Sequence, residues 1–246
     1  PEPVPALDGA LVTTVAVSGI AEPRHCALFC WLPGDPPAPG IPFKVMERIG
    51  ACTASLHLHA EQFVPPAGFV RPSWDWQRLF GPSSIMAPEK SAVLLAPDQR
   101  ALLVAVSARV RDELHVLETT PAHWGLIHAD LHRDNILIAD GQVGVIDFDD
   151  CGWGHYLFDV ASVLDSFRRR VVADPRDYPA LREAYLAGYH QVRLLPDRLD
   201  AQLTTFLVLR DMTNVNFILG SRNASVQEWG GERIVQIMQH MKEYLG

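Results

Sequence analysis

The sequence predicts an α+β fold with a small β segment at the amino terminus and a mostly helical remainder. Near the start, β-branched and apolar runs at Leu11–Val17 and His25–Leu32 are separated by turn residues, which is typical of a hairpin. From Pro42 onward, apolar residues recur every three or four positions, which is typical of amphipathic helices. No internal repeat is visible, so the pattern excludes solenoids and propellers.

The helical segments begin after a linker at 33–40 that is rich in proline and glycine. Pro42 suits the first turn of a helix, because a backbone N–H has no intrahelical partner there. The stretch 65–81 is rich in proline and aromatic residues and is either a surface loop held by its indoles or a loop that faces the substrate. The predicted helices are Pro42–Phe63, one that starts near Pro97 and continues through Leu117, Tyr156–Val172, Tyr178–His190, Leu199–Leu219 and Val226–Tyr244.

Composition limits the classes of function. The 246 residues are 48% hydrophobic, which is enough for a packed core, and 20% charged, with no uncharged run of about 18 residues that could cross a membrane. Residues 1–5 lack the basic and apolar pattern of a signal peptide, so we expect a cytoplasmic protein. A net charge of −8 without Lys/Arg runs disfavours a nucleic-acid partner and favours a cationic substrate. The four cysteines show no CxxC spacing, and we expect them to be reduced and mostly buried.

The Asp-Gly dipeptide at 140–141 predicts the tight turn of a second hairpin. Apolar runs flank it on both sides, and Asp-Gly favours a two-residue type I′ turn. Counting back along both strands places Asn135 opposite Ile146 and, one step further, Asp134 opposite Asp147. The amide of Asn135 and the carboxylate of Asp147 are therefore expected at the same open end of the hairpin.

This open end has the chemistry that phosphoryl transfer requires. An amide oxygen and a carboxylate are hard oxygen ligands of the kind that hold Mg²⁺. Asp130, on the turn before Asn135, can orient an incoming hydroxyl group and accept its proton. Phosphoryl transfer needs both parts, because the metal neutralises the transferred group while the carboxylate positions the nucleophile.

Two motifs at this position resemble a known family. Residues 127–135, Ile-His-Ala-Asp-Leu-His-Arg-Asp-Asn, have the His-x-Asp-x-x-x-x-Asn spacing of the aminoglycoside phosphotransferase and choline kinase superfamily, itself similar to the protein-kinase catalytic loop. Residues 145–150, Val-Ile-Asp-Phe-Asp-Asp, resemble its metal-binding segment, and 152–159 resemble the stretch that follows. The motifs look most similar to the bacterial stress-response kinase and homoserine-kinase-like branches. The resemblance covers about 28–219 and implies a protein-kinase-like fold with a mostly helical carboxyl-terminal lobe.

The resemblance also implies an ATP- and Mg²⁺-dependent kinase that phosphorylates an alcohol group of a small molecule. His128 is expected to be a packed residue that fixes the catalytic turn. By position, the implied roles are Asp130 as catalytic carboxylate, Asn135 and Asp147 as Mg²⁺ ligands, Asp149 as a further metal contact, His132 as a contact of the γ-phosphate of ATP, and Asp159 as a buried brace that accepts backbone N–H bonds.

The first segment resembles the hinge between kinase lobes. Backbone groups near Cys30 and Leu32 would bond the edge of adenine, although a plain buried strand that leads into a turn explains the same residues. We accordingly divide the chain into a remnant of an amino-terminal β lobe with the hinge, 1–33, and a helical catalytic lobe, 34–246.

The sequence departs from the family before this hinge. It contains no Gly-x-Gly-x-x-Gly loop, and none of its three lysines, Lys44, Lys90 and Lys242, lies in a strand near the start. We therefore expect a truncated β lobe without the phosphate-clamping lysine. Such a chain should have little kinase activity on its own, because the phosphate clamp supplies much of the positioning.

Two other functions are compatible with the residues. One is a non-catalytic kinase-like module that binds a nucleotide or a partner. The other is a metal-dependent hydrolase, with the His and Asp side chains of 128–134 and Asp147 as a transition-metal cluster. Within the kinase interpretation the acceptor is an aminoglycoside, a metabolite alcohol such as homoserine or choline, or a protein serine. An acidic pocket for a polycation would be lined by Asp149, Asp150, Glu183 and Asp211.

Overall fold

The computed structural model of the chain describes residues 1–117, 119–170 and 174–246. It confirms an α+β architecture with a predominantly helical remainder. The elements are β1 (Pro3–Val4), β2 (Thr13–Val15), β3 (Arg24–Cys26), β4 (Leu28–Phe29), α1 (Phe43–Gln62), α2 (Trp76–Phe80), α3 (Pro88–Leu94), α4 (Pro97–His115), β5 (Trp124–Ile127), a 3₁₀ turn (Arg133–Asn135), β6 (Ile136–Ala139), β7 (Gln142–Val145), β8 (Gly152–His155), α5 (Tyr156–Arg170), a second 3₁₀ turn (Pro175–Asp177), α6 (Tyr178–His190), α7 (Leu199–Gly220) and α8 (Ala224–Leu245).

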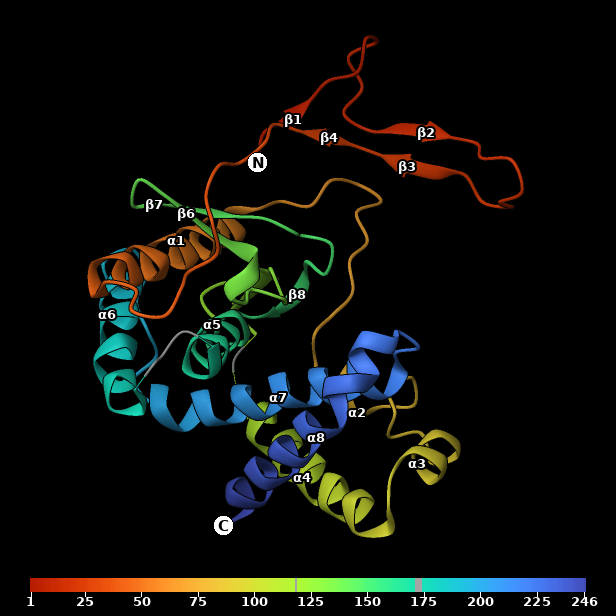
Figure 1. The fold of residues 1–246 in the computed structure, drawn as a ribbon, viewed down its shortest axis with the longest axis vertical. Coiled ribbons are helices and arrows are strands. Elements are labelled where there is room, and N and C mark those ends of the chain that lie inside the picture. Colours follow the sequence, from red (N-terminus) through yellow and green to blue (C-terminus); the bar gives the residue numbers. More distant parts are fainter. Residues whose placement is uncertain (118, 171–173) are drawn as a thin grey trace.

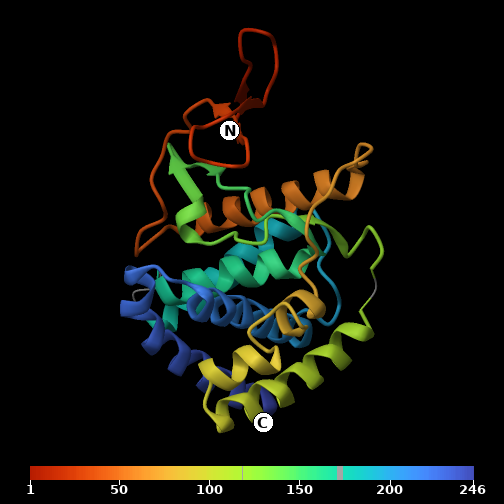
Figure 2. The ribbon, with the colours of Figure 1, turned by 90° about the vertical axis from the view of Figure 1, so that its right-hand side faces the viewer.

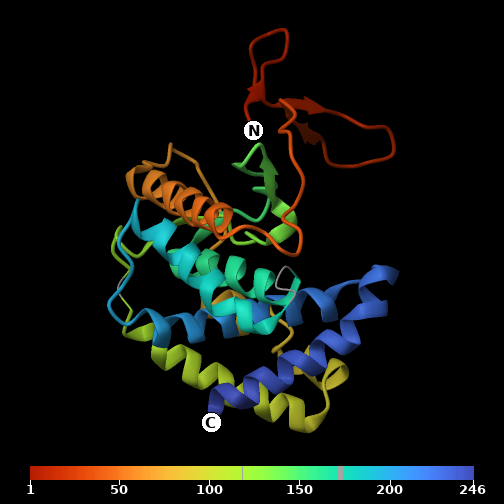
Figure 3. The ribbon, with the colours of Figure 1, turned by 60° about the vertical axis from the view of Figure 1, so that its left-hand side comes forward.

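The amino-terminal strands project from the helical body. The predicted hairpin is present, since β2 pairs with β3 in antiparallel register. The second apolar run is divided, however, because β4 pairs with β1, a strand that the sequence analysis missed. Figures 1, 2 and 3 agree that β1–β4 extend beyond β6 and β7, at the end of the molecule opposite α4 and the carboxyl terminus.

The second hairpin has the predicted register. β6 and β7 pair from Ala139 opposite Gln142 to Ile136 opposite Val145, and the Ile146 N–H donates to the Asn135 carbonyl over 3.0 Å. The turn residues at 140–141 have φ values of 50° and 73°. Both signs are those of a type I′ turn, so this prediction is confirmed.

A further antiparallel pair, β5 with β8, was not predicted. β8 reads Gly-Trp-Gly-His and therefore shows neither β-branched residues nor an apolar alternation. Its glycines are required by close packing: a Cβ at Gly154 would lie 2.4 Å from Cδ1 of Ile127, and one at Gly152 would lie 2.4 Å from the Pro72 carbonyl oxygen. The sheet directly precedes α5 and sets where that helix begins.

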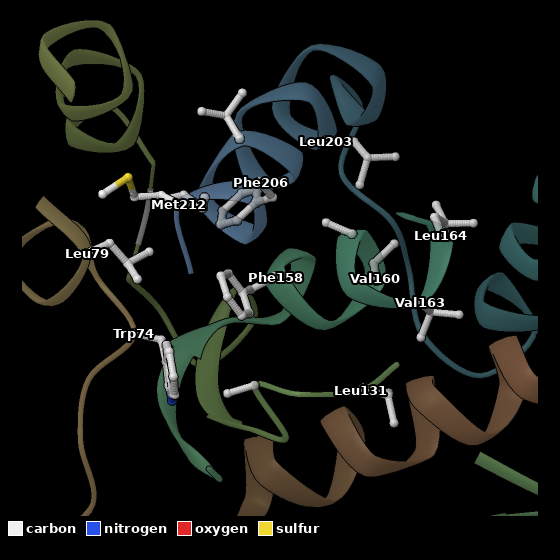
Figure 4. Close-up of a cluster of buried hydrophobic side chains, with 14 of the residues drawn as sticks. Trp74, Leu79, Leu131, Phe158, Val160, Val163, Leu164, Leu203, Phe206 and Met212 are labelled. Carbon is white, nitrogen blue, oxygen red and sulfur yellow. The ribbon is translucent and has the colours of Figure 1, made fainter. Parts of the chain in front are cut away.

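The core surrounds α5, which is buried along most of its length. α5 packs against α7 on one side and against β5 and α1 on the other, while α8 packs on α7 and α4. Figure 4 shows Phe158 of α5 between Phe206 of α7 and Trp74, which precedes α2. The rings of Phe158 and Trp74 stack with their centroids 5.9 Å apart. Because α5 carries Asp159, this packing fixes a polar residue in the middle of the core.

Most of the predicted helices agree with the structure, and α6 has the predicted bounds. The predicted end of α5 falls partly on residues outside those that the structure describes. The stretch 65–81 contains the short helix α2. The indole N–H groups of Trp74 and Trp76 donate to backbone carbonyls of other segments, so the prediction that indoles hold this stretch in place is confirmed.

The cysteines are free, as predicted, but the expectation that most are buried is wrong. Cys26 and Cys30 are exposed, and Cys52 and Cys151 are partly exposed. Among the described residues, no helix combines the length and apolar character needed to cross a membrane.

Candidate active site

A buried carboxylate holds the turn that carries Asp130. Asp159 lies in the first turn of α5 and accepts hydrogen bonds of 2.8 Å from the backbone N–H groups of both His128 and Ala129. Ala129 has a φ of 67°, a left-handed conformation that costs about 1 kcal/mol or more in a residue with a side chain. The bonds expected of Asp159 are thus present, and they stabilise a strained turn.

Asp159 is itself supported from α1 and α6. His57 Nε2 lies 3.2 Å from Asp159 Oδ2, and His57 Nδ1 lies 2.8 Å from the Tyr189 hydroxyl. Burial alone would raise the pKa of Asp159, but the hydrogen bonds that it accepts from His57 and the His128 backbone lower it below the usual value. Burial lowers the pKa of His57. Sequence analysis missed His57 and Tyr189, because contacts between residues more than 100 positions apart leave no local pattern.

His128 connects the turn that carries Asp130 to the residue that follows β7. Its Nδ1 accepts from the Asp130 backbone N–H at 3.3 Å, and its Nε2 lies 2.9 Å from the Ile146 carbonyl oxygen. A carbonyl oxygen can only accept, so Nε2 carries the proton. Both ring nitrogens are therefore engaged with backbone groups, which leaves none for a metal.

The remaining side chains do not form a transition-metal cluster either. Within residues 1–117, 119–170 and 174–246, no group of three or more His, Cys, Asp or Glu side chains is arranged to hold a metal ion. The geometry of His128 and its neighbours therefore disfavours the hydrolase alternative.

Both carboxylate oxygens of Asp130 have partners. Oδ1 lies 2.7 Å from Arg210 Nη2, and Oδ2 lies 3.3 Å from His132 Nε2. Burial would raise the pKa of Asp130, but the hydrogen bond from His132 and the charge of Arg210 outweigh it and lower the pKa. His132 Nδ1 accepts from the Asp134 backbone N–H at 3.1 Å, so its Nε2–H is directed at Asp130. The predicted contact of His132 with a phosphate stays a prediction.

Arg210 is a site residue that sequence analysis missed. It lies on α7, 80 positions after Asp130, and is buried there. The adjacent charged residues Arg210 and Asp211, which follow the apolar run 206–209, were the available signal, since Lys and Arg are rarely buried unless they are paired.

Asn135 and Asp147 are arranged in a way that fits a hard cation. Asn135 is buried, and its Nδ2 donates to the Asp130 carbonyl at 3.0 Å, which leaves its amide oxygen as the available ligand atom. Asp147 is exposed at the end of β7 with a φ of 63°. Among the described residues its carboxylate has no hydrogen bond or ion pair. One amide oxygen and one unpartnered carboxylate suit Mg²⁺, which usually takes its other ligands from phosphate and water.

The loop after Asp147 is held by its backbone. The Arg71 guanidinium donates to the carbonyl oxygens of Phe148 at 2.9 Å and Asp149 at 2.8 Å and also bonds that of Cys151, and Trp74 Nε1 donates to that of Asp150 at 2.8 Å. These bonds fix the main chain and leave the Asp149 side chain exposed. Its metal contact stays a prediction.

The segment proposed as a hinge runs against the second hairpin. Asp35 and Ile138 exchange backbone hydrogen bonds of 3.2 and 2.9 Å, and a Cβ on Gly144 would lie 2.3 Å from Leu32 Cδ2. The Cys30 N–H donates to the Glu2 carbonyl at 2.8 Å, so it is not free to bond adenine. The adenine contacts of Cys30 and Leu32, and the division at residue 33, stay predictions.

A cavity of about 1220 Å³ lies beside Asp130 and His132. It does not have the expected acidic lining: of the four carboxylates predicted there only Asp150 contributes, and Asp211 is buried in ion pairs with Arg233 and His240. Residues of the stretch 65–81 also face it. The lining residues are Trp74, Arg78, Leu79, Ser83, Ser84, Asp130, His132, Asp150, Ser166, Arg169, Arg170, Arg210, Thr213, Asn214, Asn216, Phe217, Trp229, Arg233 and Gln236.

Comparisons with known sequences identify a family that the chain matches. The model of the phosphotransferase enzyme family matches residues 3–202. A homoserine kinase of Neisseria meningitidis serogroup B is 31% identical over 196 residues, which are 78% of this chain and 57% of the relative. An uncharacterised protein of Deinococcus radiodurans is 30% identical over 238 residues, which are 94% of this chain and 64% of that protein. The chain thus spans less than two thirds of the length of these relatives.

Solved structures share the fold. A microcompartment-associated aminopropanol kinase has a TM-score of 0.74 and 29% identity, over 98% of this chain and 72% of the other. An amicoumacin kinase in complex with AMP-PNP, Ca²⁺ and Ami has a TM-score of 0.76 and 21% identity, over 96% of this chain and 71% of the other. A choline kinase from Cryptosporidium parvum has a TM-score of 0.66 and 14% identity, over 95% of this chain and 74% of the other.

Proposed function

This chain belongs to the phosphotransferase enzyme family, and from that premise we propose that the complete protein is a kinase that transfers the γ-phosphate of ATP to the hydroxyl group of a small molecule, with Mg²⁺. A homoserine kinase among its relatives and an aminopropanol kinase among its structural neighbours support a small alcohol as the acceptor. An amicoumacin kinase of the same fold binds AMP-PNP and Ca²⁺, which supports a nucleotide with a divalent metal.

Asn135 and Asp147 would hold the metal. The amide oxygen of Asn135 is left free by the bond of its Nδ2 to the Asp130 carbonyl, and the Asp147 carboxylate is exposed without a partner among the described residues. Mg²⁺, when bound, supplies positive charge that neutralises the transferred phosphoryl group. The hydrogen bonds from Arg71 to the carbonyls of Phe148 and Asp149 hold the backbone that directly follows Asp147.

Asp130 would orient the acceptor. Its lowered pKa keeps it ionised at neutral pH, so it can accept a hydrogen bond from the incoming hydroxyl group. The hydroxyl proton passes to Asp130 as the acceptor oxygen bonds the γ-phosphorus and the bond from that phosphorus to the leaving ADP oxygen breaks. His132 and Arg210 hold the carboxylate in place during this step.

One observation carries the proposal. Asp130 lines the 1220 Å³ cavity, while its backbone carbonyl accepts from Asn135 and its backbone N–H donates to His128. The metal-ligand side and the acceptor side of the site therefore meet at a single residue. This is the arrangement that in-line transfer between a nucleotide and an alcohol needs.

The test is ADP release by the complete protein with a panel of amino alcohols, hydroxy acids and aminoglycosides. Asp130→Asn should lower kcat by about 10²- to 10⁴-fold, because a positioned carboxylate contributes that much, while AMP-PNP binding is kept. Asp147→Ala should instead weaken binding of the metal–nucleotide complex. Turnover at the wild-type rate in Asp130→Asn would contradict the mechanism, and nucleotide binding without transfer to any acceptor would identify a non-catalytic binding module.

A further inference from the structure

The cavity beside Asp130 has a charge opposite to that of the protein. The chain carries a net charge of −8, yet the cavity is lined by five arginines, only two aspartates, and no lysine or glutamate. Clefts of one sign concentrate ligands of the other sign. The local charge therefore depends on which carboxylates pair with each of the five arginines.

Two of the five arginines are neutralised by single carboxylates. Arg210 pairs with Asp130, and Arg170 pairs with Asp134. Arg133, which lies outside the cavity lining, also pairs with Asp134 at 3.2 Å. Because Arg210 and Arg170 both have a carboxylate partner, the remaining three arginines decide the character of the cavity.

Arg169 and Arg233 belong to a cluster with more cations than anions. Asp165 lies 2.8 Å from Arg169 and 3.7 Å from Arg233, and it also pairs with Arg168 at 3.3 Å. Burial would raise the pKa of Asp165, but the charge of Arg169 and the other arginines lowers it, so this carboxylate stays ionised. Three guanidinium groups thus share this single buried anion.

The second anion of the cluster is also shared. Asp211 lies 2.8 Å from Arg233 and 2.5 Å from His240. The hydrogen bond to Asp211 raises the pKa of His240, which adds positive charge at lower pH. Even with His240 neutral, three arginines face two carboxylates.

Arg78 adds a further positive charge from another wall. It leaves α2 and lies over the Trp74 ring, 4.3 Å from the ring centroid. Among the described residues its guanidinium has no carboxylate partner, so its N–H donors are available. The N–H donors of a guanidinium are coplanar, and a guanidinium held on an indole face can bind a carboxylate with two parallel hydrogen bonds.

We propose that the acceptor alcohol carries an anionic group, of which the carboxylate of a hydroxy acid is the simplest case, and that Arg78 and Arg233 bind this group while Asp130 orients the hydroxyl. The proposal rests on the kinase function proposed above. It separates acceptors that carry an acid group, such as homoserine, from plain amino alcohols and polycations.

The test compares pairs of alcohols that differ only in a carboxylate, with the complete protein. The pairs are homoserine and 3-amino-1-propanol, serine and ethanolamine, and 4-hydroxyproline and 3-pyrrolidinol, with glycerol 3-phosphate and glycerol as a phosphate arm. The kcat/KM of the best acidic member should exceed that of its partner by about 100-fold, since a bidentate charged contact supports differences of this size. Equal or higher kcat/KM for every member without the acid group would overturn the proposal.

Variants of Arg78 and Arg233 test whether these side chains bind the acid group of the acceptor. Arg78→Ala and Arg233→Lys should each raise KM for the acidic acceptor by about 10-fold or more and leave KM for ATP unchanged. Arg233→Lys keeps the charge beside Asp165 and Asp211, and Arg78 is exposed, so both variants should fold, which a thermal melt checks. Arg176→Ala, on an exposed arginine outside the cavity, is the matched control. A rise in KM for ATP instead would assign these arginines to the nucleotide.

Failure of the kinase function is distinguishable from failure of this inference. If no alcohol is phosphorylated, the proposed function fails, and titration calorimetry with the same pairs still tests the arginines. Binding of the acidic members that is lost in Arg78→Ala would support the anion site by itself. Calorimetry that finds no preference for the acidic members would overturn it.

Discussion

The turn at 128–132, which carries Asp130, and the amino-terminal strands are both short, irregular segments, but they are stabilised in opposite ways. Ala129 and Leu131 of the turn are fully buried, and Asp159 and His128 satisfy its backbone groups. In the first 31 residues, by contrast, Phe29 is 52% exposed and Trp31 is 90% exposed. A strained conformation can persist only where surrounding structure determines it.

The difference indicates where substitutions should lower the free energy of unfolding most. The hydrophobic core includes residues from α1 onward and none from β1–β4, within the part of the chain that the structure describes. Short strands with exposed faces contribute little burial, and isolated two-stranded pairs are marginally stable in water. We therefore expect substitutions in the turn to be costly and those in the strands to be nearly neutral.

The largest expected effect is at Asp159. Asp159→Ala removes the acceptor for two buried backbone N–H groups and the partner of His57 Nε2. Loss of one partner from a buried charged network costs about 3–5 kcal/mol. Urea unfolding should show this loss in the free energy of unfolding. Asp197→Asn, on an exposed aspartate, should change it by less than about 0.5 kcal/mol.

Sequence patterns predicted the long helices and the β6–β7 hairpin because each has a local signal, whereas the roles of Asp130, Asn135 and Asp147 stay predictions. The Asp-Gly turn fixed the register, and apolar periodicity fixed most of the helices. The β5–β8 pair was missed because β8 is half glycine, and its fit depends on Ile127 and Pro72.

The charge of the cavity beside Asp130 could not be predicted from the same patterns. Its arginines come from α2, α5, α7 and α8, and only the tertiary packing brings them beside Asp130. The net charge of −8 suggested the opposite sign for the substrate. Net charge describes the surface as a whole, whereas binding depends on the few groups that line one cavity.

Acid should destabilise the helical body through His155. Its ring packs against Trp124 and Phe206, and burial, together with the charge of His123, lowers its pKa to about 4. Between pH 6.5 and 4 the unfolded chain binds a proton that the folded protein does not, so stability falls as pH falls in this window. The free energy of unfolding should drop by about 2 kcal/mol from pH 7 to pH 5 through this group. In His155→Phe this part of the drop should be absent; an unchanged drop would assign the acid sensitivity to other groups.

A smaller effect is expected where the loop after Asp147 is braced. Arg71→Ala removes three side-chain bonds to the carbonyls of 148–151, so the position of Asp147 becomes less defined. We expect the Kd of the Mg²⁺–AMP-PNP complex to rise about 10-fold, or about 1.4 kcal/mol, by calorimetry. Arg48→Ala is a matched control, because Arg48 bonds the Gly141 carbonyl at the other end of the same hairpin. Equal losses in both variants would indicate that the whole hairpin is destabilised.

The smallest effect is expected in the amino-terminal strands. Val15→Ala and Phe29→Ala remove side chains that are 42% and 52% exposed and lie outside the core. Surface substitutions of this kind change the free energy of unfolding by about 0.5 kcal/mol or less. Urea unfolding of the complete protein checks this. A loss of about 2 kcal/mol or more at Phe29 would mean that β4 packs against a further surface in the complete protein, because burial of a phenylalanine is needed for a loss of that size.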